Sequence, residues 1–262
     1  DIRRTTDLAR MLRYRRPAGS NTELAFIRDW LTPLGTEEDI AGNLHVVIPC
    51  RDGTASRVLW SSHTDTVHRQ DGFQQIAIGK RRIALDRASG SNCLGADDTV
   101  GVWVMREMIG AKVPGRYVFH YGEECGGIGS STIVHDAPEL FSGIDFAIAF
   151  DRRNTRDIIT RQAGQICCSD NFARSLARQL KSVSRYRPSP LGIYTDTAEY
   201  TGIIRECTNI SVGYDSEHTS RESVDYWHAL RLCKAMLKFR EDKLVCEREI
   251  PSYAEDEYLY DD

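Results

Sequence analysis

The distribution of apolar and polar residues along the 262-residue chain predicts strands and helices that alternate from one end to the other. Short apolar runs end in acidic residues or histidine, and segments with helical spacing of apolar residues lie between them. The clearest run is 58–67, Val-Leu-Trp-Ser-Ser-His-Thr-Asp-Thr-Val, a buried strand that delivers His63 and Asp65 at its carboxyl end. This alternation predicts a three-layer α/β/α sandwich around a mixed, mainly parallel central sheet.

The same pattern gives approximate bounds for the elements. Helices are expected at 5–14, 24–34, 98–109, 171–184, 197–204 and 223–240, with a short one after 126. Strands are expected at 40–49, 57–62, 117–121, 145–150 and 209–213, and 158–168 reads as a strand pair or as one bent strand. The turn Arg51-Asp52-Gly53 predicts that 40–49 and 57–62 form a hairpin, and 70–88 is expected to form another hairpin at the edge of the sheet.

The length and the even composition favour one domain over residues 1–262, because no linker or composition shift divides the chain. The last eight residues, 255–262, contain five acids and no base, and we expect them to be a solvated or frayed end.

Charge and composition narrow the class of partner. A net charge of −4 and a pI near 6.0 do not favour nucleic acid. The longest apolar runs, such as 144–150, are far shorter than the roughly 20 residues that span a bilayer, so no membrane partner is expected. Eight scattered cysteines without a CxxC pair predict reduced thiols in a cytoplasmic protein. The oligomeric state stays open.

Acidic residues and histidine gather where the expected strands end. A borderline ion such as zinc binds imidazole nitrogen and carboxylate oxygen, and two such ions can share a bridging carboxylate. So many carboxylates directed at one crevice would repel one another without cations. The candidates are His63, Asp65, Asp97, Asp98, Glu123, Glu124, Asp151 and His218.

Five motifs occur in a fixed order between residues 63 and 221: His-Thr-Asp-Thr-Val, Gly-Ala-Asp-Asp, Gly-Glu-Glu, an apolar strand ending in Asp, and Glu-His-Thr-Ser. With these motifs the chain resembles the co-catalytic di-zinc exopeptidase superfamily, which includes zinc aminopeptidases, peptidase T-like tripeptidases, and carboxypeptidase and deacylase relatives. Only 66 residues separate Asp151 from His218, too few for the lid and dimerisation domain of the carboxypeptidase branch. The resemblance is therefore nearest to the single-domain aminopeptidase branch.

The resemblance implies two bound zinc ions, with cobalt or manganese as alternatives. His63 and Asp151 would hold one ion, Glu124 and His218 would hold the other, and Asp97 would bridge the two ions.

It also implies roles for the neighbouring acids. Glu123 would be the general base, and Asp65 would orient the imidazole ring of His63. Asp98 would be an acid at a helix start, where the helix dipole favours it. An exchange of Asp97 and Asp98 is the alternative assignment.

The function that follows is a metal-dependent hydrolase that cleaves the peptide bond at the N-terminus of peptides. The first alternative is an amidohydrolase or deacylase that acts on N-acyl amino acids or a related small amide. The second is a binding protein that keeps the fold without turnover. Arg152 and Arg161 are candidates for binding a substrate carboxylate, and the competing interpretation is that they pair with Asp157 or Glu139.

Overall fold

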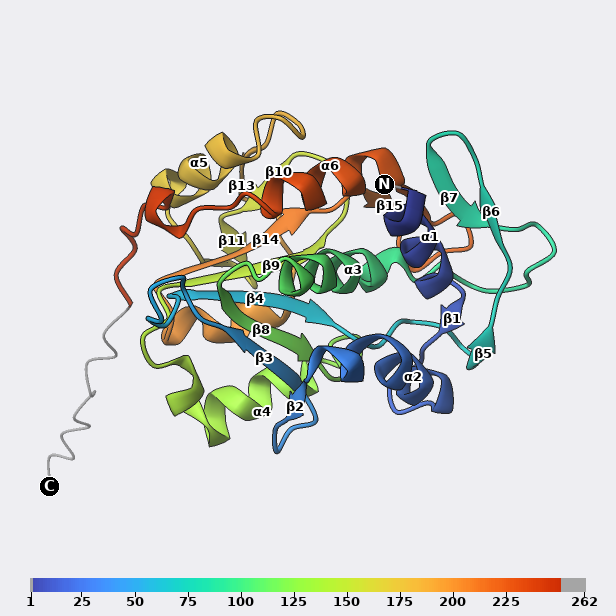
Figure 1. The fold of residues 1–262 in the computed structure, drawn as a ribbon, viewed down its shortest axis with the longest axis horizontal. Coiled ribbons are helices and arrows are strands. Elements are labelled where there is room, and N and C mark those ends of the chain that lie inside the picture. Colours follow the sequence, from blue (N-terminus) through green and yellow to red (C-terminus); the bar gives the residue numbers. More distant parts are fainter. Residues whose placement is uncertain (1, 251–262) are drawn as a thin grey trace, which may run out of the picture.

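A central eight-stranded sheet organises the protein, and the computed structural model describes it within residues 2–250, with side chains from Thr6 onward (Figure 1). The expected acidic end, 255–262, lies outside the described residues. From one edge to the other the strand order is β13-β10-β14-β9-β4-β8-β3-β2. In chain order these strands are β2 (Glu37–Glu38), β3 (Leu44–Ile48), β4 (Val58–His63), β8 (Gly115–His120), β9 (Phe146–Arg152), β10 (Asp157–Ile159), β13 (Arg187–Ser189) and β14 (Glu206–Ser211).

The centre of the sheet is parallel. Strand β4 runs parallel to β8 on one side and to β9 on the other, and β9 runs parallel to β14. Strand β3 is antiparallel to β8, so β8 lies between β3 and β4, and the predicted hairpin of 40–49 with 57–62 is wrong. The turn itself exists, with Gly53 N donating to Cys50 O at 2.9 Å. A local turn does not fix which strands are neighbours, because each central strand also needs a partner on its other side.

Helices cover both faces of the sheet. The helices are α1 (Ile2–Met11), α2 (Asn21–Phe26, continued by helical turns to Leu34), α3 (Ala96–Gly110), α4 (Ile128–Asp136), α5 (Asp170–Gln179) and α6 (Tyr226–Met236), with short turns η3 (Pro138–Phe141), η4 (Asp196–Gly202) and η5 (Glu241–Lys243). Side chains of α1, α2, α3, α5 and α6 form one core cluster, and those of α4, η3 and η4 form another.

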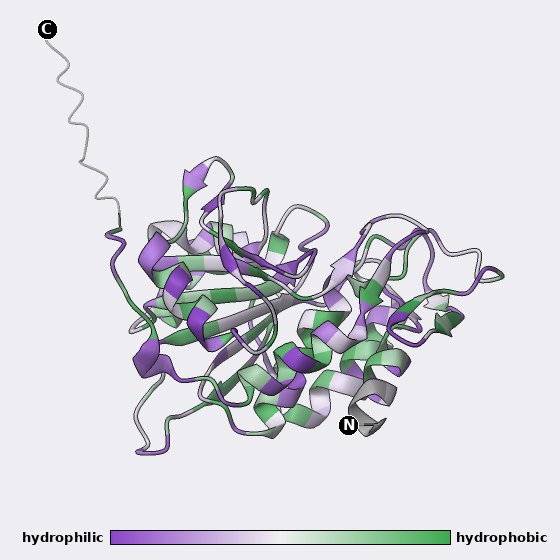
Figure 2. Cartoon of the chain, turned by 90° about the horizontal axis from the view of Figure 1, so that it is seen from above, coloured by the Kyte–Doolittle hydropathy of each residue, from purple (hydrophilic) through white to green (hydrophobic). Residues whose placement is uncertain are grey.

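Alternation along the strands explains the two cores. On β4, Val58 and Trp60 belong to the first cluster and Leu59 to the second, as the two-residue period of a strand requires. Strand β9 alternates in the same way, with Phe146 and Ile148 on the first side and Ala147 on the second. Figure 2 shows the apolar colouring concentrated on these strands and on the helices packed against them. The predicted three-layer α/β/α sandwich with a mixed, mainly parallel sheet is confirmed.

A smaller four-stranded sheet lies beside the main one. It joins β6 (Ile76–Ile78) and β7 (Arg82–Leu85) to β15 (Tyr214–Asp215) and β16 (Ser223–Asp225), in the order β15-β16-β7-β6. The predicted hairpin within 70–88 is therefore present, but it pairs with β16 and not with the edge of the central sheet. A separate two-stranded pair joins β1 (Tyr14–Arg15) to β5 (Gly72–Phe73).

Two further predictions are refined. Segment 158–168 contains β10 and an antiparallel pair, β11 (Arg161–Gln162) with β12 (Gln165–Ile166). The closing helix begins at Tyr226, because Ser223–Asp225 is a strand and Asp225 caps the helix by accepting from His228 N. Trp227, in the first turn of this helix, is exposed. None of the helices between residues 2 and 250 combines the length and apolar character that a membrane crossing requires.

Candidate metal centre

The candidate site lies at the carboxyl edge of the three central parallel strands. Strand β4 ends at His63, β8 is followed by Glu123 and Glu124, and β9 contains Asp151 near its end. Because the carboxyl ends of parallel strands meet at one edge of a sheet, these side chains converge. Asp97 reaches the same place from the first turn of α3.

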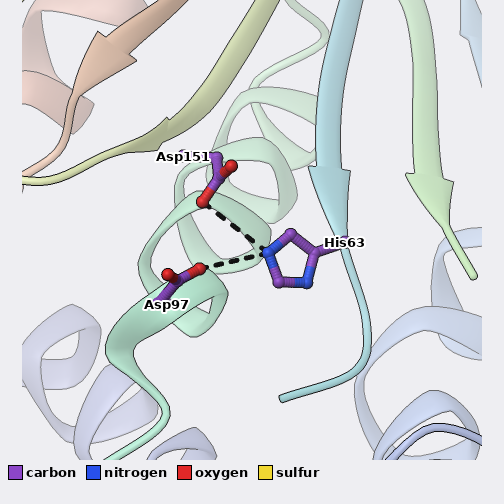
Figure 3. A group of neighbouring side chains, drawn as sticks. All are labelled: His63, Asp97 and Asp151. Carbon is purple, nitrogen blue, oxygen red and sulfur yellow. Dashed lines mark hydrogen bonds and ion pairs between the residues drawn. The ribbon is translucent and has the colours of Figure 1, made fainter. Parts of the chain in front are cut away.

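The imidazole ring of His63 is buried at the centre of this cluster. Its Nε2 lies 3.1 Å from Asp97 Oδ1 and 3.6 Å from Asp151 Oδ1. Figure 3 shows the two carboxylates, which come from α3 and β9, directed at the same ring nitrogen. One ring nitrogen with two carboxylate oxygens around it is a donor set that suits a divalent cation.

Asp97 also faces the second histidine. Its Oδ2 lies 3.3 Å from His218 Nε2, while its Oδ1 faces His63. Glu124 Oε1 lies 2.9 Å from the same His218 nitrogen. The carboxylate of Asp97 therefore stands between the two histidines, with one oxygen toward each.

The donor atoms fit two cation positions. One group contains His63, Asp97 and Asp151, another contains Asp97, Glu124 and His218, and in each group the ligand atoms lie within 4.8 Å of one another. Glu124 Oε1 is buried without a hydrogen-bond partner, although it faces His218 Nε2. Two donor atoms that face each other without hydrogen-bond geometry are arranged as ligands of a shared ion would be. The residues present thus fit a metal pair.

The pKa shifts of the clustered residues also favour a bound cation. Burial raises the pKa of Asp151 to about 7 and that of Glu123 to about 10, with further repulsion from neighbouring acids. The nearby carboxylates of Asp97 and Glu124 raise the pKa of His218 to about 11. The protein alone can hold these carboxylates together only by binding protons, whereas bound cations would supply the positive charge instead.

Asp65 contacts both the His63 ring and the loop that carries Glu123 and Glu124. Its Oδ1 lies 3.3 Å from His63 Nδ1, and its two oxygens accept hydrogen bonds from the backbone N–H groups of Glu123 and Glu124, each at 3.2 Å. A carboxylate on the far nitrogen of a ligand imidazole fixes the ring orientation. Asp65 thus couples the His63 ring to the loop that carries both glutamates.

Asp98 points away from the cation groups. It accepts hydrogen bonds from Ser62 Oγ, from His63 N at 3.3 Å and from Gly101 N at 3.1 Å. Its contact with Gly101 N places it as a cap in the first turn of α3, as the sequence suggests. Of the two neighbouring acids, Asp97 is the one that faces His63 and His218.

Three residues that the sequence did not single out orient the candidate ligands. Tyr214 Oη donates to Asp151 Oδ1 at 3.0 Å, and Asn209 Oδ1 accepts from Asp151 N at 2.9 Å. Buried Glu222 accepts from the backbone N–H groups of the loop that leads into Asp97. The sequence offered one signal for Glu222, its position four residues after His218, but nothing that specified its partners.

A pocket of about 370 Å³ opens onto the cluster. Arg152 and Arg153 line it, whereas Arg161 on β11 is not among its lining residues. Arg152 donates to Leu191 O at 2.9 Å and lies 3.4 Å from Asp157, the pairing that competes with substrate binding. Arg153 pairs with Glu217 at 2.9 Å.

Asp196 is a buried acid near the site that the sequence did not single out. Neither of its carboxylate oxygens has a hydrogen-bond partner among the described residues, and the nearby Ser130 hydroxyl donates to Gly127 O instead. Burial raises the pKa of Asp196 to about 8, and the repulsion of Asp151 and Asp65 adds to this effect.

Solved structures that match this fold include peptidases. The chain matches aminopeptidase PepT from Bacillus cereus with a TM-score of 0.74 and 14% identity, over 92% of this chain and 98% of that chain. A tripeptidase from Staphylococcus aureus matches with a TM-score of 0.74 and 15% identity over the same shares. The chain has the fold of these aminopeptidases.

A more distant match extends the comparison. The TET1 peptidase of Pyrococcus horikoshii, which can assemble into a tetrahedron or a large octahedral shell, matches with a TM-score of 0.59 and 15% identity over 90% of this chain and 98% of that chain. No protein-family model matches the sequence. No curated protein matches it either. The fold that the sequence resemblance implied is therefore confirmed by structure, at identities where sequence comparison alone finds no relative.

Proposed function

We propose that this protein is a metal-dependent exopeptidase that cleaves the peptide bond after the N-terminal residue of peptides, with two zinc ions at the described centre. The observation that carries the proposal is the position of Asp97 between the two histidines, one oxygen toward His63 and the other toward His218. A carboxylate so placed is what a shared ligand of two neighbouring ions requires.

The chain supplies ligands for both ions. His63 and Asp151 would hold one ion, Glu124 and His218 would hold the other, and Asp97 would contact both. When bound, the ions would supply Lewis acidity that activates water and polarises the substrate carbonyl. Cobalt or manganese would fill the same donor set, because imidazole and carboxylate ligands accept all three metals.

Glu123 is the group that moves the proton. It lines the pocket beside the ligands, and its side chain belongs to the cluster around His63. Its carboxylate would take a proton from the attacking water and deliver it to the nitrogen of the leaving peptide. Asp65 would keep the loop of Glu123 in position through the backbone hydrogen bond at 3.2 Å.

The pocket supports a small substrate. A volume of about 370 Å³ suits a short peptide or the end of a longer one. Arg152 is the candidate in this pocket for binding a substrate carboxylate, and such a contact would have to compete with Asp157. The related folds named as an aminopeptidase and a tripeptidase support peptides as the substrate class.

The cellular setting follows from the thiols. No disulfide joins any of the eight cysteines, all of which lie within the described residues, and a reducing compartment would keep them in this state. We therefore place the enzyme in the cytoplasm, with peptides as its partners.

The decisive test combines removal of the metal with replacement of Glu123, the proposed general base. Protein stripped with a chelator should lose hydrolysis of leucine p-nitroanilide and regain it with zinc, cobalt or manganese. Glu123→Gln should lose at least about a thousandfold in turnover, since general-base and nucleophile-activating groups contribute on this scale, while anomalous scattering at the zinc edge still finds both ions. Full activity in chelator would refute the proposal.

A parallel assay separates the two hydrolase alternatives. N-acetyl-leucine and related N-acyl amino acids should be poor substrates beside the aminoacyl anilide if the enzyme is an aminopeptidase. The reverse preference would identify a deacylase.

A further inference from the structure

The pocket beside the metal centre has one apolar wall. Ile159 on β10 contributes to it, and the loop 190–195 brings Ile193 and Tyr194 to the same pocket. Most other side chains around the pocket are charged, including the candidate ligands and the two arginines. A substrate that enters the pocket therefore meets an apolar surface on this side alone.

Ile193 is exposed to an unusual degree for a large apolar residue in a pocket. Its side chain is 74% exposed, so apolar area remains in contact with water. A bound apolar group would remove part of this area from water, which favours binding. Ile159, which also lines the pocket, is buried.

The wall is already formed without a substrate. Ile193 O accepts a hydrogen bond from Ala163 N at 2.8 Å, which fixes the loop against the β11–β12 turn. Gly192 packs so closely that a Cβ there would lie 2.2 Å from Arg161 O and 2.4 Å from Ile159 Cγ2. A loop held in this way presents Ile193 without an ordering cost on binding.

We propose, on the basis of the function proposed above, that Ile159, Ile193 and Tyr194 form the subsite for the side chain of the substrate's N-terminal residue. This subsite selects an apolar side chain of about leucine size. The N-terminal residue carries the carbonyl attacked at the metal centre, and the wall lines the same pocket as the candidate ligands. The side chain of that residue is therefore the part of the substrate that we assign to the wall. A charged side chain held against Ile159 and Ile193 is disfavoured because it would lose water and gain no hydrogen-bonding or ionic partner from either residue.

The loop supplies a matched pair of positions for the test. Leu191 is 70% exposed, close to the value for Ile193, but it is not among the residues that line the pocket. Both side chains lie at the surface, so Ile193→Ser and Leu191→Ser should both fold. The two variants differ only in whether the lost apolar group faces the pocket.

The experiment measures binding of two probes to the zinc-loaded protein by isothermal titration calorimetry. Leucine hydroxamate and glycine hydroxamate share the same metal-binding group and the same amine, and they differ only in the side chain. The wild type should bind leucine hydroxamate about 10- to 100-fold more tightly, as burial of one large aliphatic side chain predicts. Ile193→Ser should reduce this ratio about 10-fold, and Leu191→Ser should leave it unchanged.

The outcomes separate this subsite from the proposed function. An unchanged ratio in Ile193→Ser, or an equal loss in Leu191→Ser, overturns the subsite even if the enzyme cleaves leucine p-nitroanilide. A protein that shows the predicted ratios but cleaves no aminoacyl anilide retains the subsite and refutes the peptidase. Wild-type protein that binds both hydroxamates equally also overturns the subsite.

Discussion

Glu222 accepts a hydrogen bond from the backbone N–H of Asp97, with 3.1 Å between Glu222 Oε1 and Asp97 N. The other oxygen of Glu222 accepts from Leu94 N at 2.7 Å and from Gly95 N at 2.8 Å. Glu222 follows His218 by four residues, so one side chain ties the segment of the second histidine to the loop of the shared carboxylate. Glu222 is thus a positioning residue for the metal centre.

Replacing Glu222 should weaken metal binding. Glu222→Ala leaves three backbone donors without their acceptor, and we expect zinc affinity to fall about 10- to 100-fold, the usual effect of removing a group that orients ligands. Zinc competition with a chromogenic chelator measures this directly. Glu222→Asp should restore part of the affinity because it keeps a carboxylate.

The control for this experiment is Glu139→Gln, which changes an exposed glutamate on η3. It should bind zinc like the wild type. Wild-type zinc affinity in Glu222→Ala would show that the three hydrogen bonds do not set the position of Asp97.

Replacement of Asp97 and replacement of Asp98, the two adjacent acids of α3, should affect zinc binding differently. Asp97 faces both histidines, whereas Asp98 is occupied by Ser62 Oγ, His63 N and Gly101 N. Asp97→Asn should lose zinc from both positions, and Asp98→Asn should keep two ions per chain. Elemental analysis of the purified variants gives the counts, and the opposite result would assign the shared ligand to Asp98.

The sequence predicted which strand-end side chains would lie together at the candidate centre. His63, Asp151 and the two glutamates follow apolar runs, so their meeting at one edge follows from a parallel sheet. The ordered motifs then favoured one fold, and the structure has it. An acid at the end of a strand can be recognised in a sequence because the apolar run that precedes it marks the strand.

Other parts depend on contacts that no local pattern encodes. The position of β8 between β3 and β4 is decided by the whole sheet, and the turn at 51–53 gave a misleading local signal. Glu222 and Tyr214 act through the precise direction of distant backbone and carboxylate groups. The sequence gives the residue types of Glu222 and Tyr214 but does not show which groups they contact in the fold.

Asp196 provides a stability prediction. Burial raises its pKa to about 8 from 3.8, and neither oxygen has a hydrogen-bond partner among the described residues. Because the folded state holds this proton more tightly than the unfolded state, the stability it contributes below pH 3.8 is lost as the pH rises toward 8. Asp196→Asn removes the ionisable group and should stabilise the metal-free protein by about 1–3 kcal/mol at pH 8, with a smaller gain at pH 5.

Urea unfolding of the metal-free protein at pH 5 and pH 8 measures this difference. Asp170→Asn, which changes an exposed acid at the start of α5, serves as the control and should shift neither midpoint. A destabilised Asp196→Asn at pH 8 would mean that the carboxylate has a stabilising partner in solution.

The buried histidines His68 and His228, which lie outside the metal centre, predict how the free energy of unfolding changes in acid. Burial lowers the pKa of His68 and of His228 to about 4 from 6.5. His68 Nε2 lies 3.0 Å from Gln74 Oε1, and His228 Nε2 lies 2.9 Å from Tyr186 Oη, so both rings are held in neutral networks. Between pH 6.5 and 4 the unfolded chain binds protons at these two positions that the folded chain does not, and the contribution of both rings to stability should fall as the pH is lowered through this window. Each ring should account for about 1–3 kcal/mol of this loss. His228→Gln should remove the share of this pH-dependent loss that belongs to one ring, while His68 and the buried His120 still titrate. An unchanged dependence of the unfolding free energy on pH would show that His228 is protonated in the folded protein.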